Sequence, residues 1–423
     1  MDQTATKKPL RITLWVLLLV YIFNFLDRQI VNILAEPISR DLDLSDTQIG
    51  LMTGIAFAAF YTVLGIPIAR YADRPSTNRV RLISGALVIW SGMTALCGVA
   101  QNFTQLLLAR IGVGVGEAGC TPAAHSLIAE LAPPEKRSSA MAFYALGIPI
   151  GSLLGLALGG VLADQLGWRI AFLVVGLPGI VLAVFVMLLL RDPRTENLLS
   201  ADGAPQQIPL GEALRQIMSS QAFVLLVIAG SAASFLSYGK QTWVAIFLQR
   251  SHGLSVSETG LTLGIVMAVG AVTGTWLGGW LADRYGHTNR KHVLTAPAVG
   301  MLIAVPIQFA SYFVTNWLAA ALLLIVPYAL NSLYYGPTYS SAQGLVPVRA
   351  RAMASAALLF CQNLIGLGLG PLFFGMLSDQ FKPIAGDESV RWVLYGAAFL
   401  GFIPAFFFWR ASLRLNEELD QKD

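Results

Sequence analysis

Four charged residues lie inside otherwise apolar stretches of the sequence: Asp27, Arg28, Arg110 and Glu117. Each charge costs about 2.5–3.5 kcal/mol at the centre of a membrane helix, so we expect the four to pair or to face a water-filled cavity. Burial raises the pKa of a carboxyl group, and a nearby arginine lowers it. A buried carboxylate whose contact with arginine changes is therefore suited to binding and releasing a proton.

The spacing of these residues favours one cluster. Glu117 follows Arg110 by two helical turns on the same face, about 10 Å away. Arg110 and Asp27 are expected at similar depths on helices that run in opposite directions. We therefore predict that Asp27 and Glu117 approach Arg110 and couple transport to protons, while Arg28 contacts a substrate headgroup. The alternative is a static salt-bridge cluster that joins the two helices.

A further charge, Lys240, lies in an apolar stretch of the second half of the chain. It either extends along the apolar surface to the outer interface, which we prefer, or attracts an anionic headgroup. With Arg28 and Lys240, four more side chains are candidates for binding substrate on an amphipathic cavity surface: Tyr238, Asn331, Tyr334 and Tyr335. For each tyrosine, helix packing or an interface anchor is an equal alternative.

The composition places all these residues in a membrane protein. The chain has 423 residues, is 55% hydrophobic and 12% charged, and has a mean hydropathy of +0.64. A soluble protein carries about 25% charged residues. A net charge of +4 without basic clustering argues against nucleic acid as a partner. We predict an all-α fold with transmembrane helices near 13–35, 48–70, 82–101, 103–130, 138–163, 168–190, 221–249, 257–281, 292–313, 317–346, 351–378 and 390–410.

The distribution of lysine and arginine predicts the orientation of these twelve spans. Of the 28 basic residues, Arg28, Arg110 and Lys240 fall within spans. With the N-terminus inside, the outer loops contain only Arg40, Arg169, Arg250, Lys382 and Arg391. The remainder lie in the inner segments, which predicts that both termini are cytoplasmic in a multi-pass protein of the cell (inner) membrane.

The two halves of the sequence repeat one another, which predicts two pseudo-symmetric six-helix bundles over residues 1–191 and 221–423. Ala72-Asp73-Arg74 recurs as Ala282-Asp283-Arg284 in the equivalent loop. We predict that ion pairs of these aspartates and arginines latch an inner gate. Residues 192–220 are predicted to be a cytoplasmic linker with a short amphipathic helix around Leu210, Leu214 and Ile217.

Two glycine ladders predict where helices approach closely: Gly147, Gly151, Gly155 and Gly159, and then Gly270, Gly274 and Gly278. Small residues every fourth position let helix backbones come together in a membrane. We expect these faces where the two halves slide past each other.

Several motifs resemble those of a known family. Asp73-Arg74, Asp283-Arg284 and the Arg110–Gly116 segment resemble motifs of the major facilitator superfamily. Five segments in shared order resemble its spinster family: Leu26–Gln29, Ser45–Leu51, Arg110–Gly119, Gly167–Arg169 and Asn363–Pro371. The resemblance implies a major facilitator fold, alternating access, and proton-linked transport of lysolipids or sphingosine phosphate.

Other classes of function are less well supported by the sequence. The four histidines are dispersed, and no nucleophile, zinc or Walker motif is present, so we expect neither an enzyme nor a metal or cofactor. The expected partners are a proton, an amphiphilic substrate and membrane lipids, with the monomer as the functional unit. A proton-coupled multidrug or organic-anion carrier is one alternative, and a membrane sensor without net transport is another.

Overall fold

The computed structural model describes residues 3–74, 76–133, 136–196, 215, 217–286, 289–347 and 350–420. Helices are the only regular structure within these ranges, and no strand occurs in them. The chain forms two compact units, one of Met1–Ala204 with Ser255–Gly264 and the other of Pro205–Leu254 with Ile265–Asp423.

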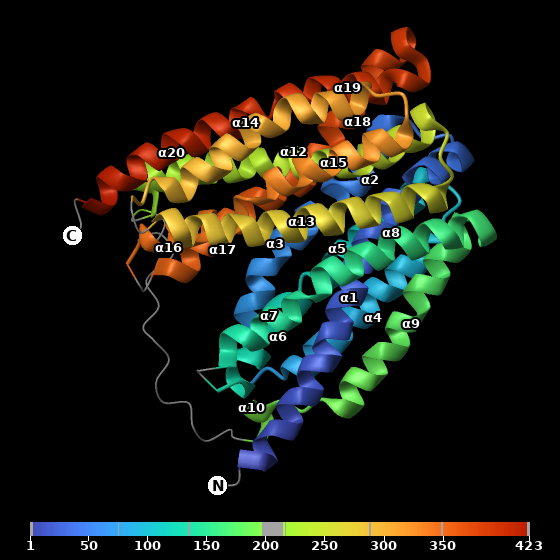
Figure 1. Cartoon of the computed structure of the whole chain (residues 1–423). Helices are drawn as coiled ribbons and strands as arrows, with labels where there is room; N and C mark the ends of the chain where they lie inside the picture. The colour runs from blue at the N-terminus through green and yellow to red at the C-terminus, as the bar shows by residue number, and fades with distance from the viewer. Residues whose placement is uncertain are drawn as a thin grey trace. The chain divides into compact units, whose positions relative to one another are not determined.

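The first unit contains the helices drawn in blue to green in Figure 1. Their bounds are α1 Gln3–Leu42, α2 Asp46–Thr53, α3 Ile55–Ala72, α4 Arg79–Cys97, α5 Phe103–Glu117, α6 Cys120–Leu131, α7 Arg137–Ala145, α8 Gly147–Leu166, α9 Trp168–Leu189 and α10 Pro193–Glu196. Helix α1 packs along α8, and α4 packs against α5 and α9.

The second unit contains the remaining described helices, except that residues 256–264, the start of α13, belong to the first unit. It also contains a π-helix, η3, and a short 3-10 helix, η4. The bounds are α12 Gln221–His252, α13 Val256–Gly286, α14 His292–Phe313, α15 Trp317–Ser332, α16 Tyr335–Gly344, α17 Arg351–Cys361, η3 Gln362–Leu369, α18 Gly370–Ala385, η4 Gly386–Glu388, α19 Ser389–Phe399 and α20 Phe402–Asp420. Helix α12 packs against α20, η3 and α18, and α14 packs against α15 and α20.

Polar side chains fix where several helices begin. Ser45 and Gln48 form a capping box at α2, in which the Ser45 hydroxyl accepts from the Gln48 N–H and the Gln48 amide oxygen accepts from the Ser45 N–H. Each bond satisfies a backbone N–H group that has no partner within the helix. Asn78, Asn102 and Asn316 cap α4, α5 and α15 in the simpler manner, with one side-chain oxygen.

Ten helical segments within the described residues are long and apolar enough to cross a membrane. The predicted span 103–130, which comprises α5 and α6, is not among these ten. The last of the ten, Met353–Glu418, includes both of the final predicted spans. The all-α membrane fold is confirmed, and the ten segments are compatible with twelve spans.

Several spans are interrupted by short breaks. Helix α5 ends at Glu117, and α6 begins three residues later at Cys120, after Ala118 and Gly119. In the second unit, α15 ends at Ser332 and α16 begins at Tyr335. Broken helices in membrane proteins occur where the backbone is buried in protein or lines a cavity. The first break places Glu117 at the end of a helix, in the interior of the unit.

Both glycine ladders are close-packing faces, as predicted. A Cβ added at Gly155 would lie 2.7 Å from the carbonyl oxygen of Leu26 on α1, and one at Gly274 would collide with the carbonyl oxygen of Ala329 on α15. Each ladder therefore faces a helix of its own unit. The expectation that the ladders mark a surface on which the halves slide is wrong, because backbone contact with these neighbours occupies both faces.

Most of the predicted linker helix lies outside the described residues, including Leu210 and Leu214. Ile217 is fully buried in the core of the second unit, with Phe223, Leu294 and Phe408.

Candidate functional site

The four charged residues predicted from the sequence meet inside the first unit. Asp27 and Arg28 lie on α1, and Arg110 and Glu117 lie on α5. Asp27, Arg110 and Glu117 are 1%, 1% and 0% exposed. The Arg28 side chain is 15% exposed. Such burial of four ionisable groups requires that they compensate one another.

The ion pair in this cluster joins Arg28 to Glu117, with Nε and Oε2 separated by 2.6 Å. The Arg28 guanidinium also lies over the rings of Tyr61 and Phe57, at 4.5 and 5.0 Å from their centroids. Aromatic faces attract a guanidinium and exclude water from it. The sequence predicted Glu117 beside Arg110 and left Arg28 for substrate, so the pairing partner differs from the expected one.

Asp27 has a weaker set of contacts. Its Oδ2 accepts a hydrogen bond of 3.2 Å from the Thr94 hydroxyl, while Oδ1 is buried without a hydrogen-bond partner among the described residues. Both polar atoms of the nearby Asn24 amide are also buried and unpartnered. A buried carboxylate oxygen without a donor is costly, and such groups concentrate at functional sites.

Arg110 makes no ion pair within 4 Å in the described part of the chain, and its Nε and Nη1 have no hydrogen-bond partner. Its guanidinium lies 5.4 Å from the Phe57 centroid. The Arg28 guanidinium lies over the same ring, 5.0 Å from its centroid. Among the described residues, the cluster therefore has one ion pair, Arg28 with Glu117. Asp27 and Arg110 have no ionic partner within 4 Å there.

In the second unit, Lys240 is 7% exposed, and its Nζ donates a 2.8 Å hydrogen bond to Oε1 of Gln308. The preferred interpretation, in which Lys240 extends to the outer interface, is wrong. The Gln308 amide nitrogen in turn donates a 2.9 Å bond to the Tyr312 hydroxyl. A polar partner on α14 is available to hold the ammonium inside, and no spacing in the sequence indicated this contact.

Lys240 lines a small cavity of about 40 Å³. Asn331 also lines it, as predicted for a cavity residue, whereas Tyr238, Tyr334 and Tyr335 are not among its lining residues. Tyr334 is buried, bonds to Ser234 at 3.2 Å and stacks on Tyr335 at 4.5 Å between ring centroids. These two tyrosines pack with the core of the unit.

The four predicted gating residues are exposed: Asp73, Arg74, Asp283 and Arg284. Within the described ranges, neither aspartate lies within 4 Å of a basic group. Arg74 lies over the Tyr71 ring at 5.7 Å. The latch stays a prediction.

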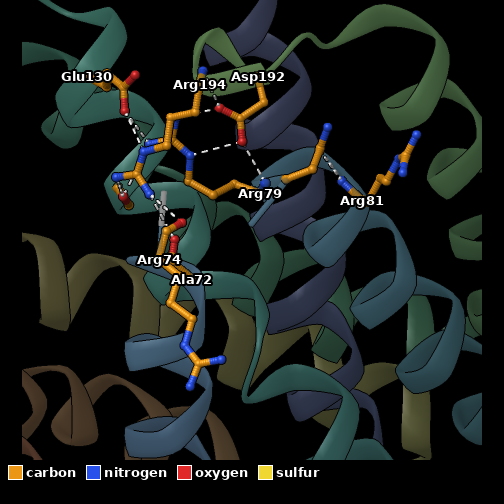
Figure 2. A network of polar contacts seen from close by, with 9 residues as sticks. Ala72, Arg74, Arg79, Arg81, Glu130, Asp192 and Arg194 are labelled. Atoms are coloured by element: carbon orange, nitrogen blue, oxygen red, sulfur yellow. Dashed lines mark hydrogen bonds and ion pairs between the residues drawn. The ribbon is translucent and has the colours of Figure 1, made fainter. Parts of the chain in front are cut away.

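A second charged network, at the ends of α4, α6 and α9, was missed by the sequence analysis. Figure 2 shows Arg79 between Asp192 and Glu130, with Arg194 reaching the same Glu130. Arg79 and the Asp192 side chain are fully buried and lie 2.5 Å apart, while Glu130 is 36% exposed. The bonds of Asp192 to both the backbone N–H and the side chain of Arg79 fix the start of α4.

This network also involves the loop that follows α3. The Arg194 guanidinium donates to the carbonyl oxygens of Ala72 and Arg74, at 3.1 and 3.4 Å. Burial raises the pKa of the Asp192 carboxyl group, but hydrogen bonds from Arg79 and Arg194 outweigh it and hold the pKa below its usual value. Asp192 is therefore an ionised anchor at neutral pH. A basic residue after the Asn78 cap and an acidic one after α9 were the only sequence signals for it.

The chain is similar to known membrane transporters. The family model of the Major Facilitator Superfamily matches residues 17–371. An MFS-type efflux pump of Mycolicibacterium smegmatis is 35% identical over 414 residues, which cover 96% of this chain and 93% of that protein. Protein spinster homolog 1 of Homo sapiens is 27% identical over 395 residues, covering 88% and 74% of the two chains.

A solved structure has the same fold over nearly the whole chain. It is the crystal structure of a bacterial homologue of the human lysosomal transporter Spinster, in an inward-facing and unoccupied conformation. The TM-score is 0.87 and the sequence identity 32%, with 99% of each chain covered. The fold and the family are those of membrane transporters. This chain belongs to the Major Facilitator Superfamily, as a multi-pass membrane transporter related to the spinster proteins.

Proposed function

We propose that the protein is a proton-coupled secondary transporter of an amphiphilic organic substrate, of the lysolipid or sphingosine-phosphate kind, which works by alternating access. One observation carries the proposal. The Arg28–Glu117 ion pair is buried beside Asp27 and Arg110, which have no ionic partner within 4 Å among the described residues. A buried carboxylate whose arginine contact can change is suited to proton coupling, and Glu117 with Arg28 provides one such contact beside a second buried carboxylate, Asp27.

The proposed coupling step is the protonation and deprotonation of Glu117. When the Glu117 carboxylate binds a proton, it becomes a neutral carboxyl group and its ion pair with Arg28 is lost. Arg28 is then free to contact an anionic group of the substrate. When Arg28 returns to Glu117, the attraction between them favours the ionised form, and the proton leaves. Asp27 is placed to exchange protons in the same way through Arg110.

The amphiphilic class of substrate rests on the surroundings of Arg28. Its guanidinium is lined by the rings of Phe25, Phe57 and Tyr61. A cation bordered by aromatic faces suits a molecule that joins an anionic headgroup to an apolar body. The relationship to the spinster proteins is consistent with such a substrate.

A multidrug or organic-anion carrier is the second candidate. The M. smegmatis relative carries the name of an efflux pump. The cavity around Lys240 in the second unit also offers a cation to an organic anion. A sensor without net transport is the alternative from another class.

We also propose the domain organisation, orientation and gate that the sequence predicts. Residues 1–191 and 221–423 form two six-helix bundles joined by a cytoplasmic linker, both termini lie in the cytoplasm, and the monomer transports. Asp73 with Arg74 and Asp283 with Arg284 take part in the inner gate. Labelling of single cysteines placed at residue 3 and residue 418 with an impermeant thiol reagent tests the orientation, because both should react only after the membrane is opened.

Uptake into proteoliposomes tests the function. The purified full chain is reconstituted, and lysolipids, sphingoid phosphates, drugs and organic acids are offered with and without an imposed pH gradient. We expect the pH gradient to accelerate uptake of at least one amphiphile relative to protein-free liposomes. Saturable uptake that is independent of the pH gradient would contradict proton coupling, and binding without flux would favour a sensor.

A further inference from the structure

The cavity in the second unit contains a lysine that has no counter-ion within the described part of the chain. Among the described residues that line the cavity, Lys240 is the only ionisable one apart from Tyr312 and Tyr328, and none is an aspartate or glutamate. The only hydrogen-bond acceptor recorded for its ammonium group in the described structure is the neutral amide of Gln308. A buried charge whose partner is only a dipole is incompletely compensated.

The hydrogen bonds around Gln308 leave donors of Lys240 unused. The amide oxygen of Gln308 accepts from Lys240, and its nitrogen donates to Tyr312, so the amide orientation is set by both neighbours. An ammonium group has three N–H donors, of which the bond to Gln308 uses one. The remaining two have no other acceptor among the described residues.

Other polar side chains of the cavity are also available. Ser237, Tyr328 and Asn331 line it, and their side chains make no hydrogen bond within the described ranges. The rest of the lining is apolar and includes Leu236 and Met301. A few convergent polar groups on an otherwise apolar wall are typical of small-molecule sites.

We propose that this cavity binds the anionic group of an organic substrate, a carboxylate or a phosphate, with Lys240 as its counter-ion. Asn331 and Tyr328 donate to oxygen atoms next to the anionic group. The inference rests on the proposed transport function and deepens it, because it adds a second cation for the anionic group of the substrate, besides Arg28 in the first unit. Cations are disfavoured here, since they would meet an uncompensated ammonium group.

Matched pairs of ligands that differ in the anionic group test this site. The full chain in nanodiscs is heated with oleoyl lysophosphatidic acid or oleoylglycerol, and with galacturonate or galactose, and the rise in apparent Tm is measured. A ligand that binds only the folded protein raises its stability in proportion to the logarithm of its concentration over Kd. We expect the anionic member of at least one pair to stabilise the protein more than its neutral partner. The pair that responds distinguishes a lipid headgroup from a free sugar acid.

Variants connect the response to Lys240. Lys240→Met should weaken binding of the anion by about 10- to 100-fold, the value of a lost charge-assisted hydrogen bond. Lys240→Arg should retain the preference for the anion. Lys382→Met, the same change at an exposed lysine of α18, should bind as the unaltered chain does. If Lys240→Met does not fold, Lys240→Gln, which keeps a donor for Gln308, replaces it.

Three results would overturn the proposal: equal stabilisation by the neutral ligands, no stabilisation by either anion, or full anion binding after loss of Lys240. Binding is measured without a pH gradient, so none of these results would contradict proton-coupled uptake. Conversely, the absence of proton coupling in proteoliposomes would not contradict anion binding at Lys240.

Discussion

Arg28 and Glu117, 89 residues apart in sequence, form an ion pair of 2.6 Å that joins helix α1 to helix α5. Asp27, the neighbour of Arg28, has no such partner and accepts a hydrogen bond from Thr94. Successive residues on a helix point about 100° apart, so one helix can direct a paired arginine and an isolated carboxylate to different neighbours. This difference leads to distinct predictions for variants of the two carboxylates, Asp27 and Glu117.

Asp27→Asn should abolish acceleration of uptake by the pH gradient without lowering stability. The amide oxygen of asparagine can still accept from Thr94, and the substitution removes a buried charge that lacks an ionic partner. We expect the free energy of unfolding to change by less than about 1 kcal/mol or to increase. Apparent Tm and uptake with and without the gradient check this. A clear fall in Tm would indicate that Asp27 mainly holds α1 to its neighbours.

Asp192→Asn should destabilise the first unit more than Glu130→Gln. Asp192 is the fully buried partner of Arg79, whereas Glu130 is 36% exposed. Removal of one member of a buried ion pair costs about 3–5 kcal/mol, and an exposed pair contributes about 0–1 kcal/mol. Thermal denaturation of both variants measures the difference. Equal effects would show that the network acts as an exposed cluster.

The same network predicts a response to acid. The pKa of Asp192 is lower in the folded protein than its ordinary value of 3.8, so its stabilising contribution is present above that value. The contribution is lost as the pH falls through the lower pKa of the folded protein. The Tm difference between the unaltered chain and Asp192→Asn should therefore be constant near neutral pH and shrink below about pH 4. A difference that shrinks between pH 8 and pH 6 would contradict this assignment.

Gly155→Ala should lower the apparent Tm, whereas Gly85→Ala should not. The added Cβ would lie 2.7 Å from the Leu26 carbonyl oxygen in the first case and meets nothing within 4 Å in the second. Alanine is also the better helix former by about 1 kcal/mol, which favours the second variant. Denaturation of the two purified variants compares the same chemical change at two helical sites. Equal tolerance would mean that α1 and α8 can separate without cost.

The sequence predicted the fold well because membrane helices are defined by their own composition. Long apolar segments, their repeat and their motifs were sufficient for the family. The glycine ladders likewise predicted close packing, since a small face needs a close neighbour, but the spacing did not say which helix that neighbour is. Backbone contact with α1 and α15 depends on the tertiary arrangement.

The candidate site was predicted in part. Burial of Asp27, Arg110 and Glu117 follows from their positions in apolar segments. The choice of Arg28 over Arg110 as the partner of Glu117 depends on the rotation of two helices about their axes, which spacing within each helix does not determine. The same limit applies to Lys240, whose partner Gln308 is on another helix. The network of Arg79 and Asp192 was missed because its members lie at helix ends, where charged residues are ordinarily solvated.

Transport by Glu117→Gln tests the central claim most directly. The variant keeps an oxygen that accepts from Arg28 but cannot exchange a proton at neutral pH. In proteoliposomes it should lose acceleration of uptake by a pH gradient while retaining counterflow exchange of substrate, and the exposed Glu417→Gln should retain both. Undiminished gradient-driven uptake by Glu117→Gln would contradict the account, and so would loss of exchange at normal protein levels.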